Sequence, residues 1–77
     1  MTRPLILITG PGGRIGREIL TGLRERWRLR LFDRQHLSAA ADDEFIQGEI
    51  QDAAAIRQAC AGTEGVVHLA AISDEAE

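Results

Sequence analysis

The chain has 77 residues but no lysine and no tyrosine, so all nine of its basic residues are arginines. This absence excludes a reaction that needs a lysine amine or a tyrosine phenol from within these residues. The single cysteine, Cys60, excludes an internal disulfide and a metal site built from several cysteines. This sparse use of cysteine leads us to expect a protein of the reducing cytoplasm.

Long apolar runs are also missing. The longest one near the N-terminus covers residues 5–8, whereas a membrane-spanning helix needs about 20 apolar residues and a signal peptide needs a longer apolar core. We therefore expect no membrane partner. The net charge of −3 argues against a protein that binds a phosphate backbone, while the 44% hydrophobic and 27% charged residues suit a folded domain.

Segments with strand and helix character alternate along the chain. Continuous apolar runs predict strands buried on both faces, and apolar residues at helical spacing predict amphipathic helices. The predicted strands are residues 5–8, 29–32, 44–48 and 65–70, and the predicted helices are residues 14–26 and 53–61. This order predicts an α/β fold with right-handed crossovers and a parallel sheet.

The loop after the first strand reads T-G-P-G-G-R-I-G over residues 9–16. Gly10 permits a tight turn, Gly13 lets the backbone approach a pyrophosphate, and Gly16 permits close packing of the helix on the sheet. The free N–H groups at the start of the helix then face the phosphates. A nucleoside-triphosphate P-loop would need a lysine, which this chain lacks. The loop therefore predicts the dinucleotide site of a Rossmann-type fold.

An acidic residue follows this loop at the end of the second predicted strand. Asp33 comes 23 residues after Gly10, where a carboxylate can accept hydrogen bonds from the adenosine ribose and repel a 2′-phosphate. Arg34, with help from Arg14, could instead pair with a 2′-phosphate. Because Asp33 is expected closest to the ribose, we favour NAD over NADP.

These motifs together resemble the N-terminal part of the extended short-chain dehydrogenase/reductase family, also called the NAD-dependent epimerase/dehydratase family. The resemblance covers the whole chain and rests on residues 9–16, Asp33, residues 48–52 and residues 66–71. It implies that Glu49, where the family usually has Asp, lies near the adenine amino group and that Ile50 borders the ring. The implied cofactor-binding residues are Gly10, Gly12, Gly13, Arg14, Ile15, Gly16, Asp33, Arg34, Glu49, Ile50, Leu69, Ala70 and Ala71.

The resemblance also implies a function. Residues 1–77 are then the N-terminal half of an NAD(P)-binding Rossmann domain: the first half of a doubly wound sheet, with four strands and two helices. Family members are oxidoreductases, epimerases or dehydratases of sugars and nucleotide-sugars, often homo-oligomeric, and the end of this chain looks most like a uronate or other sugar dehydrogenase. Their Tyr-x-x-x-Lys catalytic pair is absent here, so we expect no catalytic residue in this chain and regard it as part of a longer enzyme.

Two other interpretations stay open. The chain could be a complete, small, non-catalytic nucleotide-binding or interaction module, although a 77-residue core is marginal for independent folding. It could also bind nucleic acid through the arginines between Arg24 and Arg34, which lie beside Trp27 and Phe32. Against this second interpretation, we expect those arginines to be solvated at a helix end and on exposed strand positions.

Overall fold

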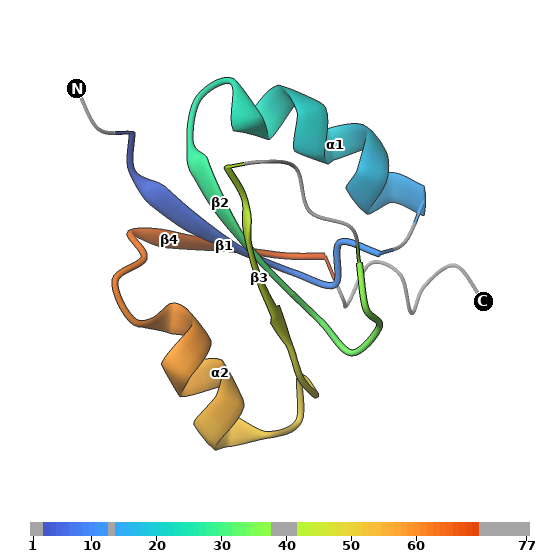
Figure 1. Cartoon of the computed structure of the whole chain (residues 1–77), viewed down its shortest axis with the longest axis vertical. Helices are drawn as coiled ribbons and strands as arrows, with labels where there is room; N and C mark the ends of the chain where they lie inside the picture. The colour runs from blue at the N-terminus through green and yellow to red at the C-terminus, as the bar shows by residue number, and fades with distance from the viewer. Residues whose placement is uncertain (1–2, 13, 38–41, 70–77) are drawn as a thin grey trace.

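The structure is a computed structural model that describes residues 3–12, 14–37 and 42–69. Four strands and two helices alternate in the predicted order (Figure 1). Their bounds are β1 (Leu5–Thr9), α1 (Arg14–Arg24), β2 (Arg28–Asp33), β3 (Glu44–Gln47), α2 (Ala53–Cys60) and β4 (Gly65–His68). Within the described ranges, no helix is long and apolar enough to cross a membrane.

The four strands form one parallel sheet in the order β3-β2-β1-β4. Along the chain, β2 is added beside β1 and β3 beside β2, and β4 is then added on the other side of β1. This reversal leaves β1 in the interior and β4 at an edge. The predicted α/β fold, the first half of a doubly wound sheet, is therefore confirmed.

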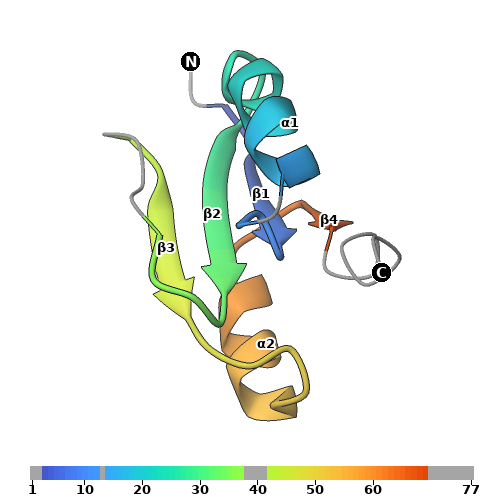
Figure 2. The same cartoon turned by 90° about the vertical axis from the view of Figure 1, so that its right-hand side faces the viewer.

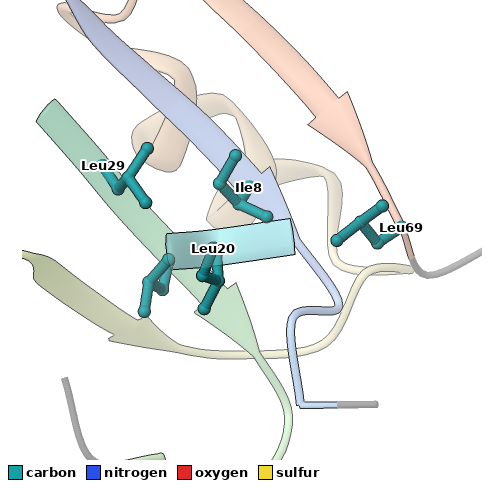
Figure 3. Packing of buried hydrophobic residues seen from close by; sticks show 5 residues of the cluster. Ile8, Leu20, Leu29 and Leu69 are labelled. Carbon is teal, nitrogen blue, oxygen red and sulfur yellow. The ribbon is translucent and has the colours of Figure 1, made fainter. Parts of the chain in front are cut away.

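The two helices cover opposite faces of the sheet, as Figure 2 shows from the side. On one face, Leu20 of α1 packs with Ile8 of β1, Leu29 of β2 and Leu69, the residue directly after β4 (Figure 3). All four side chains are at least nine-tenths buried. The helical spacing of the apolar residues in α1 therefore does place them against the sheet.

On the other face, α2 packs over a smaller cluster. Leu7 and Phe32 of the sheet and Ala59 of α2 are almost completely buried there. Asp52 caps α2, because its carboxylate accepts the N–H groups of Ala54 and Ala55 at 3.1 and 3.2 Å. This is the cap expected of an aspartate that precedes an alanine-rich helix.

Several predicted ends are wrong by one or two residues. Helix α1 ends at Arg24 rather than at residue 26, because the N–H groups of Glu25 and Arg26 donate to carbonyls only three residues back. The N–H of Arg28 then donates to the carbonyl of Pro4 at 2.9 Å and starts β2 one residue early. Strand β4 ends at His68, and its predicted last residue lies outside the described part.

The arginine cluster is held largely by carboxylates. Arg24 donates from Nε and Nη2 to Oδ2 of Asp43 at 2.9 and 2.7 Å, and the Asp43 side chain is only 2% exposed. Arg28 and Arg30 both pair with Glu44 on β3. The expectation that these arginines are solvated is therefore wrong for Arg24 and Arg30, whereas the Arg28 side chain is 40% exposed and contacts Glu44 at 3.4 Å.

Arg30 also joins the sheet to α2. Its Nη1 donates to the carbonyl oxygens of Ala59 and Ala61, both at 2.6 Å, at the end of the helix. We expect Arg30→Met to lower the free energy of unfolding of the full-length protein by about 2 kcal/mol, since charged hydrogen bonds are lost. Arg26→Met, at an exposed position, should change it by less than about 0.5 kcal/mol. Urea unfolding measures both, and equal effects would contradict this assignment.

Candidate functional site

The candidate site lies where the parallel strands end. Thr9, Asp33 and His68 are the last residues of β1, β2 and β4, so they stand at the same edge of the sheet. Because the chain reverses direction across the sheet at β1, a crevice is expected at this edge between β1 and β4. Open α/β sheets bind their ligands at such a switch point.

A glycine turn leads from β1 toward α1. Gly10 has φ +72°, a left-handed conformation that side chains disfavour. Its N–H donates to the carbonyl of Phe32 at 2.8 Å, which fixes the turn to the end of β2. Helix α1 begins at Arg14 with no acidic residue in its first turn. The positive end of the helix dipole is thus left without a competing carboxylate, as an anion site requires.

Asp33 holds this turn from the side of β2. Its Oδ2 accepts the N–H of Gly12 at 2.8 Å, and its Oδ1 accepts the N–H of Gln35 at 3.0 Å. The residue is 8% exposed. A Cβ on residue 12 would lie 2.9 Å from Asp33 Oδ2 and 3.2 Å from Cδ2 of Leu37, so only glycine fits between them. Each carboxylate oxygen has two lone pairs, so each can still accept one hydroxyl hydrogen.

The connection from β3 to α2 passes beside Asp33. The N–H of Gly48 donates to the backbone carbonyl of Asp33 at 3.0 Å. A Cβ on Gly48 would lie 2.9 Å from Cζ of Phe32, so this approach also depends on glycine. Glu49 and Ile50 follow, and both are exposed, Ile50 by 40%. They are therefore available to border a ligand held by Asp33.

The structure brings together much of the predicted site. At the strand ends, Gly12 is hydrogen-bonded to Asp33 and Gly10 to the preceding Phe32, with exposed Arg34 next in the chain. Arg14, Ile15 and Gly16 lie in the first turn of α1. Gly13, Ala70 and Ala71 lie outside the described residues. Leu69 is 4% exposed, with its side chain in the core, and its contact with a cofactor stays a prediction.

Sequence reasoning missed the polar contacts that join the site to its neighbours. Thr9 Oγ1 lies 2.6 Å from His68 Nδ1, and Gln47 Nε2 donates to the carbonyl of Arg34 at 3.0 Å. His68, the last residue of β4, is exposed. The position of Thr9 directly before Gly10 is the one signal that could have drawn attention to it.

A family model described as the NAD dependent epimerase/dehydratase family matches residues 6–77. The chain belongs to this family. The match includes the glycine turn, Asp33 and the β3–α2 connection, so it covers the whole candidate site. The resemblance inferred from the sequence motifs is therefore confirmed.

Relatives with named activities match most of this chain over part of their own length. An NAD-dependent glucose-6-phosphate dehydrogenase of Haloferax volcanii is 35% identical over 71 residues, which cover 84% of this chain and 27% of that protein. The crystal structure of uronate dehydrogenase from Agrobacterium tumefaciens superposes with a TM-score of 0.80 and 35% identity, over 90% of this chain and 27% of that one. A mutant of that enzyme complexed with NAD gives a TM-score of 0.80 and 34% identity, over 88% of this chain and 26% of that one. This chain thus spans about a quarter of the length of these relatives.

Proposed function

We propose that this chain binds the adenosine and pyrophosphate of NAD as part of an oxidoreductase that acts on a sugar or nucleotide-sugar. The observation that carries the proposal is the buried Asp33 carboxylate, bonded to the N–H of Gly12 at 2.8 Å. Through this bond, the carboxylate that would accept the ribose hydroxyl groups also holds the turn beside which the phosphates would bind. When bound, NAD supplies the acceptor for a hydride from the substrate.

The adenosine ribose would bind at Asp33. Its two hydroxyl groups would donate to the lone pairs that the contacts with Gly12 and Gln35 leave free. A 2′-phosphate would bring negative charge against a carboxylate that is 8% exposed, and such a repulsion is weakly screened. This argument supports NAD over NADP, even though the exposed Arg34 follows Asp33.

The pyrophosphate and the adenine would bind on either side of this ribose. The phosphates would accept hydrogen bonds from the N–H groups in the first turn of α1, which carries no acidic residue, and would lie against the backbone of the glycine turn, where Gly10 adopts a left-handed conformation. The adenine would lie against the β3–α2 connection, with Ile50 beside the ring and Glu49 near the amino group. The exposure of both residues is consistent with these roles.

The names of the relatives support a sugar substrate for the whole protein, because one is a uronate dehydrogenase and another a glucose-6-phosphate dehydrogenase. We also propose that the protein acts in the cytoplasm, where the dinucleotide cofactor is present and a lone cysteine such as Cys60 stays reduced. No residue of this chain is assigned to the chemical step.

Two glycines test the proposal as a matched pair. Gly10 and Gly62 have similar backbone angles, with φ of +72° and +79°, but only Gly10 lies in the proposed phosphate turn. Alanine at either position should lower stability by about 1–2 kcal/mol, because both must adopt a left-handed conformation. Gly10→Ala should in addition weaken NAD binding by about tenfold or more.

Calorimetric titration of the two full-length variants with NAD measures this difference, and thermal unfolding measures the shared loss of stability. If both variants bind NAD as tightly as the wild-type protein does, the turn does not hold the pyrophosphate. If neither the variants nor the wild-type protein binds NAD, the proposed function is wrong.

A further inference from the structure

A side-chain hydrogen bond joins the ends of β1 and β4. Oγ1 of Thr9 lies 2.6 Å from Nδ1 of His68, a residue 59 positions later in the chain. Thr9 is 2% exposed, whereas His68 is exposed at the edge of the sheet. Among the described residues, His68 is the side-chain partner that this buried hydroxyl has. We name these two residues the Thr9–His68 clamp.

The clamp lies at the start of the glycine turn. The backbone carbonyl of Thr9 accepts the N–H of Leu69 at 2.8 Å, so β4 holds Thr9 through its side chain and its main chain. The next residue, Gly10, is held from the opposite side by the carbonyl of Phe32. The point where the chain leaves β1 is therefore fixed from both neighbouring strands, across the switch point of the sheet.

We propose that His68 is a positioning residue for NAD, acting through Thr9 on the turn that receives the pyrophosphate. This inference rests on the proposed function. His68 itself needs no contact with the cofactor. Without its ring nitrogen, the Thr9 hydroxyl must rotate to a new partner or draw water into a buried position, because a buried hydroxyl is rarely left unpaired. Either change moves the residue that precedes Gly10.

The geometry confines this effect to one part of the site. The ribose acceptor Asp33 lies at the end of β2 and is bonded to Gly12 and Gln35, not to the clamp. Strand β1 also pairs with β2 over all five of its residues, so the sheet does not depend on the clamp for its assembly. Loss of the clamp should therefore reduce binding of the pyrophosphate and spare binding of adenosine.

The test compares variants of the full-length protein. His68→Leu and Thr9→Val each remove one half of the clamp, and the double variant removes both. His68→Asn keeps a polar atom at the position of Nδ1. Thr21→Val makes the same change as Thr9→Val at an exposed position on α1, so it serves as the control. NAD affinity is measured by calorimetry, adenosine affinity by ligand-observed NMR, and stability by thermal unfolding.

We expect His68→Leu and Thr9→Val to weaken NAD binding about tenfold each, as the loss of one hydrogen bond to a buried hydroxyl allows. The double variant should be no weaker than either single one, because the two side chains act as one unit. His68→Asn should stay within about threefold of the wild type, and Thr21→Val should bind NAD as tightly as the wild type does. Adenosine affinity should change by less than about twofold throughout.

Three results would overturn the inference: unchanged NAD affinity in His68→Leu, additive losses in the double variant, or equal losses for NAD and adenosine. The last result would mean that the clamp only supports the fold. Failure of the proposed function would look different, because the wild-type protein itself would then not bind NAD.

Discussion

Asp33→Ala is expected to weaken NAD binding about 100-fold, the largest effect on function that the structure predicts. The substitution removes both acceptors proposed for the ribose hydroxyl groups. It also leaves the N–H of Gly12, now bonded to Oδ2 at 2.8 Å, without its partner. Each hydrogen bond to a charged group contributes about 1.5–3 kcal/mol. The loss of two such bonds is therefore large enough to account for a 100-fold loss of affinity, which corresponds to about 2.7 kcal/mol. NADP binding should fall far less, because the repulsion of its 2′-phosphate is removed as well.

The control for this variant is Asp42→Ala. Asp42 is exposed in the connection before β3, so its replacement changes the net charge equally without altering the site. Calorimetric titrations with NAD and NADP should show wild-type values for this control. If Asp33→Ala stays folded and binds NAD as tightly as Asp42→Ala does, the ribose does not bind where we propose.

Phe32→Ala should have the largest effect on stability, a loss of about 3–5 kcal/mol. Phe32 is 1% exposed and packs with Leu7 beneath α2. It also supports Gly48, whose Cα would carry a Cβ only 2.9 Å from the ring. Truncation to alanine therefore leaves a cavity under helix α2 and under the connection proposed to border adenine.

Urea unfolding of the full-length protein, followed by circular dichroism, measures this loss. Gln58→Ala is the control, since Gln58 is exposed on α2, the helix that covers Phe32. It should change the free energy of unfolding by less than about 0.5 kcal/mol. A loss below about 1 kcal/mol for Phe32→Ala would contradict the assignment of Phe32 to the core.

The main features of the fold followed from local patterns in the sequence. Apolar runs of strand length, the stripe of Ile19, Leu20 and Leu23, and the N-cap at Asp52 depend on residues close together in the chain. The structure confirms the elements that these patterns predict. The start of β2 and the end of β4 were less predictable, because they depend on hydrogen bonds to Pro4 and Thr9 from distant parts of the chain.

Around the site, too, some features could be predicted from the sequence and others could not. Asp33 could be predicted from its distance to Gly10, because a βαβ unit fixes where the second strand ends. The pairing of Arg24 with Asp43 could not, because it depends on the path of the connection between β2 and β3. The Thr9–His68 clamp joins residues 59 positions apart, and only the placement of β4 beside β1 brings them together.

The most direct test of the account is a crystal structure of the full-length protein soaked with NAD. We predict electron density for the adenosine ribose within hydrogen-bonding distance of both Asp33 oxygens, with the pyrophosphate against the backbone of residues 10–13 and the start of α1. Density for NAD elsewhere on the protein, or a dinucleotide whose ribose does not contact Asp33, would contradict the account.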